Sequence, residues 1–286
     1  MRRLALVLLL LVAAEVHAAE AHAILWSVRG EHNTVYLAGS MHFLPAAEPL
    51  PPAMLAAYRD AEQLVMELDM DDLSPADVQL VTLQQGMLPA DESLEEQLGT
   101  DAFARVDAEA QELGLDTTVL QRMRPWLAAL TLTQLQLSKL GWSSEAGVEQ
   151  RFVRLAAADH KEIVGLESLP EQVELLASLS SELQRQFILY SVDDADALPR
   201  EVEQLTRAWR EGDDKELQAL FEDGFRKYPK LYEPLTVVRN RAWMSTIEPL
   251  LKQRDDYLIV VGAAHLVGRD SVVDLLRRRG FTLVKH

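Results

Sequence analysis

The chain has 286 residues and no cysteine, and its 45 acidic and 28 basic residues give a formal net charge of -17. This charge excludes nucleic acid as a partner, because nucleic-acid binding depends on Lys and Arg side chains that neutralise phosphates. It also argues against attachment to an anionic membrane surface. Without cysteine the chain forms no disulfides, so the fold relies on apolar burial, which a chain of this length can provide as one large domain.

The first 23 residues have the pattern of a secretory signal peptide. A basic start is followed by an apolar core over residues 4–14, which is too short to span a bilayer comfortably. Small residues predict cleavage after Ala18 or after Ala23, and these sites disfavour the alternative of an uncleaved membrane anchor. We therefore expect a periplasmic or secreted protein with no membrane attachment after cleavage, and a single domain over residues 24–286.

The N-terminal part of this domain predicts strands. Residues 24–29 and 34–38 are β-type runs with a hairpin turn between them. A helix is expected over 53–61, and residues 63–69 predict a third, largely buried strand with Glu67 near its end. A carboxylate at such a position is paired, is coordinated to a cation, or is desolvated at a cost.

The middle and the C-terminal part combine helices with a few more strands. Residues from about 74 to 160 read as mostly helical, and residues 161–167 predict a short strand that ends at Glu167. The later helices are expected over 180–190, 198–209, 214–225, 236–251 and 271–279, and the later strands over 257–261 and 281–284. Because strands cluster at both ends, the sequence predicts an α/β fold: a mixed sheet formed from N- and C-terminal strands, with a large helical insertion.

A short motif occurs twice, each time at the end of a predicted buried strand. The copies are Gly39-Ser40-Met41-His42 and Gly262-Ala263-Ala264-His265. A terminal glycine lets the strand turn sharply and lets its backbone approach a ligand, and open α/β sheets bind ligands beyond the carboxyl ends of their strands. A single copy is typical of an ordinary loop, but the repetition indicates that His42 and His265 share a metal or acid/base centre.

Glu67 completes a set of candidate metal ligands with these histidines. Two histidines and a carboxylate form a common three-ligand set that leaves a position open for water. A divalent metal lowers the pKa of such a water toward neutrality. Glu67 is then either a ligand or a general base, and a buried structural ion pair is the alternative. The ligand types suit zinc, manganese and cobalt equally.

Four further residues are candidates for supporting roles. Glu149 and Glu167 could each orient a histidine by accepting its other N–H, although a helix-capping role is as good for Glu149. Arg239 and Asn240 are expected to hold a substrate carboxylate or to stabilise an oxyanion. The alternative for this pair is a salt bridge on a helix face.

These motifs together resemble the TraB/GumN family, whose animal relatives are the Tiki proteins. The resemblance runs over nearly all of the domain and is carried by 25–28, 35–45, 65–68, 147–149, 165–168 with 171–172, 239–241 and 261–268. It implies a metal-dependent peptidase, as in the Tiki branch, whose active site matches His42, His265 and Glu67. The chain departs from the family pattern at Glu149, where aspartate is usual, and in the filling Ser40-Met41 of the first motif.

The leading hypothesis is thus a secreted metal-dependent hydrolase that cleaves a peptide or protein substrate. A second hypothesis is a non-catalytic periplasmic binder that sequesters a peptide or a metal-containing ligand such as haem. A third is a metal-dependent hydrolase of a non-peptide ester or glycan. The sequence leaves open the substrate, the identity and number of metal ions, and the oligomeric state.

Overall fold

The computed structural model describes residues 22–193 and 195–286. The expected signal peptide therefore lies outside the described residues, except for its last two positions. Among the described residues, no helix is both long enough and apolar enough to cross a membrane.

A six-stranded mixed sheet organises the fold, with strand order β6-β4-β7-β2-β1-β8. Its strands are β1 (Leu25–Arg29), β2 (Thr34–Ser40), β4 (Gln63–Met66), β6 (Ile163–Gly165), β7 (Tyr257–Gly262) and β8 (Leu283–Lys285). β7 lies between β2 and β4 and pairs with both in parallel, and β6 adds to β4 in parallel. β1 pairs antiparallel with β2 and β8. The sheet thus joins strands from both ends of the chain, which confirms the predicted fold class.

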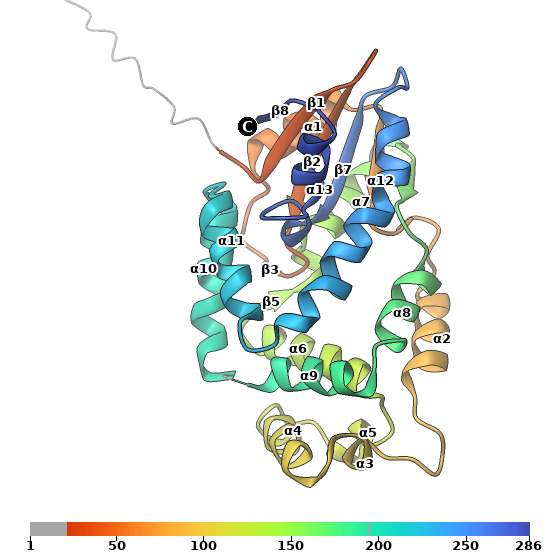
Figure 1. Cartoon of the computed structure of the whole chain (residues 1–286), viewed down its shortest axis with the longest axis vertical. Coiled ribbons are helices and arrows are strands. Elements are labelled where there is room, and N and C mark those ends of the chain that lie inside the picture. The colour runs from red at the N-terminus through yellow and green to blue at the C-terminus, as the bar shows by residue number, and fades with distance from the viewer. Residues whose placement is uncertain (1–21, 194) are drawn as a thin grey trace, which may run out of the picture.

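Helices cover both faces of this sheet (Figure 1). The covering helices are α1 (Pro52–Asp60), α7 (Val148–Asp159), α12 (Val238–Leu250) and α13 (Val272–Arg278). The ring of Tyr58 in α1 packs at a tilt against that of Phe152 in α7, and α12 contacts α13. Crossover connections between parallel strands are right-handed, so the direction in which a connection crosses the sheet decides which face its helix covers. The connections that contain α1 and α7 move outward across the sheet toward β6, whereas those with α12 and α13 move back toward β8.

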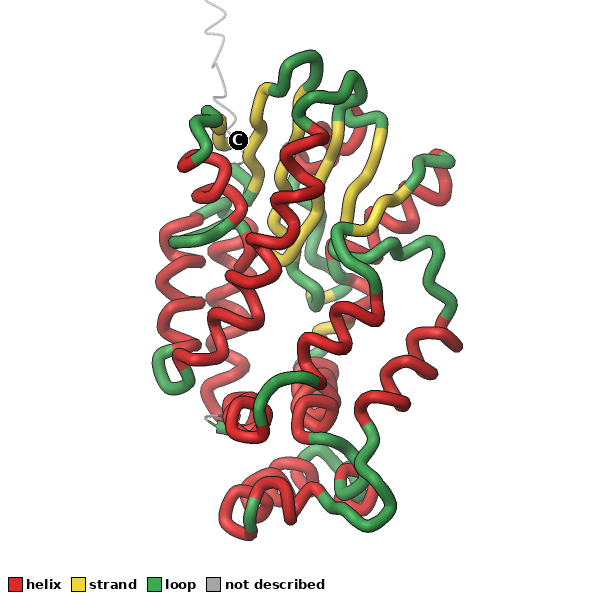
Figure 2. Tube along the Cα trace, turned by 45° about the vertical axis from the view of Figure 1, so that its right-hand side comes forward, coloured by secondary structure: helices red, strands yellow, loops and turns green. Residues whose placement is uncertain are grey.

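The helical insertion consists of two pieces of the chain, one before β6 and one after it in the sequence. The first piece holds α2 (Pro75–Gly86), α3 (Leu94–Leu98), α4 (Thr100–Glu112), α5 (Thr117–Leu120) and α6 (Pro125–Lys139). The second holds α8 (Leu169–Ala177), α9 (Ser181–Val192), α10 (Leu198–Arg210) and α11 (Asp214–Phe225). The pieces pack on each other through α6 and α9 and share an apolar cluster apart from the sheet core (Figure 2).

Two strands are shorter than the sequence predicts. β4 ends at Met66 and β6 at Gly165, so Glu67 and Glu167 lie just beyond the strands. The two segments stay together past this point, because the Glu167 N–H donates to the Glu67 carbonyl at 3.0 Å. Both carboxylates are therefore positioned at the carboxyl edge of the sheet, outside its apolar interior.

The segment before α12 also differs from the expected loop and helix. Pro229–Leu231 forms a 3₁₀ turn, and Glu233–Val237 forms a π-helical turn that leads directly into α12. The Thr236 hydroxyl donates to the Tyr232 carbonyl inside this turn. A π turn changes the direction in which the following side chains point. Arg239 is in the first turn of α12, so the π turn helps to set its direction.

Candidate functional site

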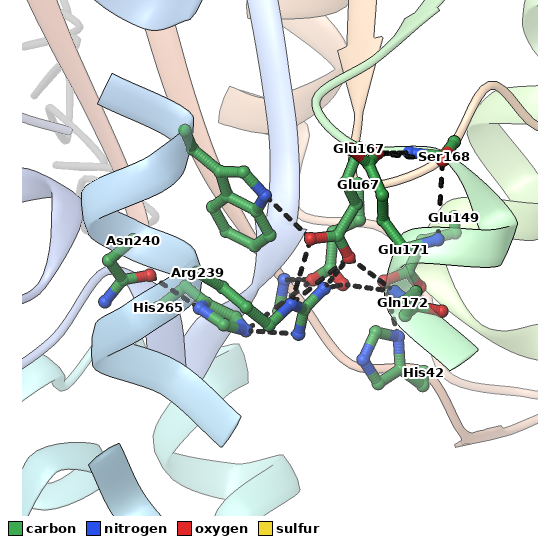
Figure 3. A network of polar contacts seen from close by, with 12 residues as sticks. His42, Glu67, Glu149, Glu167, Ser168, Glu171, Gln172, Arg239, Asn240 and His265 are labelled. Carbon is green, nitrogen blue, oxygen red and sulfur yellow. Dashed lines mark hydrogen bonds and ion pairs between the residues drawn. The ribbon is translucent and has the colours of Figure 1, made fainter. Parts of the chain in front are cut away.

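The carboxyl ends of four parallel strands meet at one edge of the sheet. Ser40 of β2 pairs with Gly262 of β7, and Met66 of β4 pairs with Val260 of β7 and with Gly165 of β6. The two histidine motifs and the two glutamates each continue from one of these ends. The sheet thus brings together residues that are far apart in the sequence (Figure 3).

Gly262 lies at the centre of this group. A Cβ atom built on Gly262 would lie 3.4 Å from Glu67 Oε1, 3.4 Å from His42 Nε2 and 3.5 Å from His265 Cδ2. The Gly262 N–H also donates to Glu67 Oε1 at 2.8 Å. The three residues predicted as metal ligands therefore surround one point at the end of β7.

His42 is held by the carboxylate of Glu149. Its Nδ1–H donates to Glu149 Oε1 at 2.7 Å, and the Ser40 hydroxyl donates to the same oxygen. Glu149 is in the first turn of α7, so the helix fixes the carboxylate and the carboxylate fixes the ring. The Nε2 atom of His42 is left to face the centre of the site, and the side chain is 60% exposed.

His265 is held by Asn240. The ring Nδ1 lies 2.6 Å from Asn240 Oδ1, and Asn240 Nδ2 donates to the Asp270 carbonyl at 3.0 Å. This second bond fixes the orientation of the amide, so Oδ1 accepts and His265 carries its proton on Nδ1. Asn240 is fully buried. The Nε2 lone pair of His265 therefore points toward the centre of the site, where Arg239 Nη1 lies 3.1 Å away.

Arg239 links the two glutamates across the site. Its Nη2 donates to Glu67 Oε2 at 2.5 Å and to Glu167 Oε1 at 2.5 Å. The guanidinium also lies over the ring of Trp243, with 4.7 Å from Cζ to the ring centroid. The buried charge of Arg239 is thus balanced by two carboxylates and covered by an aromatic face.

Glu167 anchors this arrangement from the β6 side. It accepts hydrogen bonds from Trp243 Nε1 at 3.0 Å and from Gln172 Nε2 at 2.9 Å, in addition to those from Arg239. Gln172 Nε2 also lies 3.5 Å from Glu67 Oε2. Ser168 and Glu171 form a capping box at the start of α8, which positions the first turn that carries Gln172.

A model of the TraB/PrgY/GumN family matches residues 24–285. The chain belongs to this family. It is 26% identical over 272 residues to the uncharacterised protein YbaP of Escherichia coli K12, a match that covers 88% of this chain and 97% of YbaP. It is 25% identical over 271 residues to an uncharacterised protein of Treponema pallidum, covering 89% of this chain and 80% of that protein. No solved structure matches the chain.

Charges within the site of this TraB/PrgY/GumN protein shift the pKa values of its groups. The Glu149 carboxylate raises the pKa of His42 to about 9. Burial acts to raise the pKa of Glu67, but the guanidinium of Arg239, followed by His265 and His42, lowers it to about 2. Burial lowers the pKa of His265 to about 3. At neutral pH the protein without metal therefore holds an ionised Glu67, a charged His42 and a neutral His265.

The structure changes two of the expected supporting roles. Asn240 is fully buried and contacts His265, so it positions the histidine and has no surface open to a substrate. Glu167 contacts Arg239 and not a histidine, because β6 lies at the far edge of the sheet, beyond β4. Glu149 contacts a histidine, His42, through its carboxylate.

Two further residues of the site were not assigned a role from the sequence. They are Trp243, whose ring centroid is 4.6 Å from that of His265, and Gln172. Trp243 follows Arg239 by four positions on α12, and this spacing places both on one face of a helix. That spacing is the signal in the sequence that could have indicated Trp243.

Imidazole nitrogens and carboxylate oxygens, the donor atoms of His42, His265 and Glu67, are types that divalent metals accept. Each histidine has its Nδ1 held by a neighbour, which is the usual arrangement of metal-bound imidazoles. Among residues 22–193 and 195–286, no three His, Asp or Glu side chains stand as a ready coordination group. Arg239 lies against both His265 Nε2 and Glu67 Oε2, so an ion bound between them requires this guanidinium to withdraw. Glu167 offers Arg239 a second anchor for that movement.

Proposed function

We propose that this protein is a metal-dependent hydrolase that cleaves peptide bonds, with His42, His265 and Glu67 as the residues that hold the cation. The observation that carries the proposal is the convergence of His42 Nε2 and Glu67 Oε1 beside His265 around Gly262. Side chains from three different strand ends meet there, and both rings are fixed through Nδ1. A purely structural ion pair between Glu67 and Arg239 does not require either feature.

Each residue of the site would have a separate role in this reaction. A divalent cation at this site supplies a Lewis acid and a water of lowered pKa. Asn240 and Glu149 hold the two imidazoles in their binding orientation. Glu67 keeps its carboxylate ionised at neutral pH and held toward Gly262, so that it can serve as a ligand of the cation. Arg239, released from Glu67 onto Glu167, offers its guanidinium to the carbonyl oxygen of a substrate.

We further propose that the protein acts in the periplasm or outside the cell, on a peptide or protein substrate. The basic and apolar start of the sequence supports export. The family resemblance to metal-dependent peptidases supports the substrate class. The negative net charge and the partly apolar walls of the site are compatible with a peptide and do not suit a nucleic acid.

Metal content tests the proposal directly. The wild-type protein, the double variant His42→Ala/His265→Ala and the control His32→Ala would be stripped with chelator and reloaded with zinc, manganese or cobalt. Bound ions would be counted by mass spectrometry. His32 is an exposed histidine in the turn between β1 and β2, so its removal controls for adventitious binding. We expect the wild type and the control to retain an ion that the double variant lacks.

A peptide-library digest with each metal form would follow, with Glu67→Gln as the inactive reference. Cleavage by the wild type and its loss in Glu67→Gln supports the enzyme. Metal binding without cleavage of any peptide would favour the non-catalytic binder instead. Absence of bound metal from a folded wild type would overturn the metal-dependent mechanism, and circular dichroism of each variant confirms that folding is intact.

A further inference from the structure

A cavity of about 200 Å³ opens directly onto the candidate site. It is lined on one side by the polar groups of His42, Glu67, Glu149 and Gln172, and by Ser144 and Gln150. Pockets that enclose a whole drug-sized ligand measure about 300–1,000 Å³. The cavity is smaller than this range, so its size suits a single side chain of a larger substrate.

The other side of the cavity is apolar and is built from neighbours of the reactive residues. Phe43 follows His42, Met66 and Leu68 flank Glu67, and Met70 closes the wall. The side chains of Phe43, Leu68 and Met70 are partly exposed to solvent. Partly exposed apolar side chains that face a cavity gain free energy when an apolar group covers them.

Three polar side chains on the lining have partners in the site. Glu67 is paired with Arg239, Glu149 with His42, and Gln172 donates to Glu167. A lysine or glutamate side chain that entered the cavity would lose part of its hydration, at a cost in free energy. The lining therefore favours an apolar side chain over a charged one, and also over the empty space left by glycine.

We propose that this cavity is a specificity pocket that takes one apolar side chain of a peptide, of the size of leucine, methionine or phenylalanine, next to the bond that is cleaved. The inference rests on the proposed function and adds the substrate class. His265 and Arg239 are not part of the cavity lining. The pocket thus lies on the His42 side of Glu67, and the polar groups on the opposite side are left for the peptide backbone.

The test uses a series of fluorescent polyalanine peptides in which one internal position is Leu, Met, Phe, Gly, Lys or Glu. Binding is measured by fluorescence anisotropy with the Glu67→Gln variant, which keeps the shape of the pocket and does not consume the peptide. Cleavage by the metal-loaded wild type is mapped by mass spectrometry. We expect the Leu, Met and Phe peptides to bind at least about 10-fold more tightly than the Gly, Lys and Glu peptides, and to be cut beside that residue.

Substitution of Phe43 tests whether this wall causes the preference. Phe43→Ala removes the ring and should reduce the apolar preference by about 10-fold, whereas Phe43→Leu should restore most of it. Val119→Ala is the matched control, because Val119 is an apolar residue with 48% exposure on α5, among the helices remote from the site (Figure 1). It should leave the preference unchanged.

The outcomes separate the pocket from the proposed function. Apolar preference in binding without cleavage by any metal form would leave the pocket standing and overturn the hydrolase. Cleavage of all peptides at equal rates would support the hydrolase and overturn the pocket. Equal binding of all peptides, or a preference that Phe43→Ala leaves intact, overturns the pocket.

Discussion

Each histidine of the site has one ring nitrogen fixed by a different kind of neighbour. His42 is held by a carboxylate from α7, and His265 by an amide from α12. The carboxylate makes His42 basic, whereas burial keeps His265 neutral. Two copies of one short motif thus give two histidines of different charge, and the difference comes entirely from residues outside the motif.

The substitution Asn240→Ala should lower both the stability of the fold and the metal affinity of the site. The change leaves the His265 N–H and the Asp270 carbonyl without their buried partners, which should destabilise the protein by about 1–3 kcal/mol. It should also lower metal affinity by about 10- to 100-fold, since the ring loses its orientation. Urea unfolding and metal titration measure the two effects. Ser245→Ala on the exposed face of the same helix is the control, and equal metal affinity in both variants would contradict the positioning role.

Glu149→Gln should lower the pKa of His42 in the protein without metal. The ionised carboxylate stabilises the imidazolium and holds this pKa at about 9, above the ordinary value of 6.5. A neutral amide of the same size removes that attraction, so the ring should lose its proton at lower pH. The pH titration of the His42 ring proton by NMR, after chelator treatment, measures the shift. Glu145→Gln, at an exposed carboxylate nearby, should leave the pKa at its wild-type value.

At the scale of elements, the two motif glycines serve close packing and not an unusual backbone conformation. Neither Gly39 nor Gly262 is among the glycines with positive φ. Gly39 lies within β2, and Gly262 ends β7 and leads directly into a 3₁₀ turn. A Cβ on Gly39 would lie 2.3 Å from Ile24 Cγ2, and the Gly39 carbonyl accepts from Trp209 Nε1 at 2.7 Å. The end of β2 is thus enclosed by β1 and α10.

The two glycines should therefore respond differently to alanine. Gly39→Ala places a methyl group against the buried Ile24 and should destabilise the protein by about 1–3 kcal/mol or more. Gly262→Ala makes only ordinary contacts, at 3.4 to 3.5 Å, with the site residues. It should fold normally but should bind metal poorly, because the methyl group fills the space between the donor atoms. Thermal unfolding and metal titration separate the effects, and strong metal binding by Gly262→Ala would contradict the proposed centre.

At the scale of the whole molecule, the ends of the chain meet beside the sheet. The Ala23 N–H donates to the His286 carbonyl at 3.0 Å, and Ala23 is fully buried. Ala23 is thus part of the folded domain, although it is also a residue of one candidate signal cleavage site. Both ends lie beside the carboxyl end of β2, because Leu25 pairs with Ala38 and the Gly39 N–H donates to the Ile24 carbonyl at 2.7 Å.

This contact predicts which cleavage site is used. Cleavage after Ala18 retains Ala23 in its buried place, whereas cleavage after Ala23 removes it. We expect N-terminal sequencing of the protein from a periplasmic extract to begin at Ala19. A purified chain that begins at Ile24 should melt at a lower temperature than one that begins at Ala19. A mature N-terminus at Ile24, with no loss of melting temperature, would contradict the prediction.

Local patterns in the sequence were sufficient for the fold class and for placing His42, His265 and Glu67 at one edge of the sheet. Apolar runs identify the strands, and a parallel strand places whatever follows it at the carboxyl edge of the sheet. His42, His265 and Glu67 could therefore be assigned to one edge before the sheet order was known. The strand ends at Met66 and Gly165 and the π turn before α12 were missed.

The tertiary structure alone decided the partner of each site residue. The position of β7 between β2 and β4 brings His42, His265 and Glu67 around one glycine. α12 adds Arg239, Asn240 and Trp243 to this site. Such contacts join residues separated by as many as 195 positions, as in the bond from Gly262 to Glu67. The hydrophobic periodicity of a sequence predicts only which residues share a face of one helix or strand. The charge states, the anchored imidazoles and the apolar pocket therefore follow from the packing of elements and not from any local pattern.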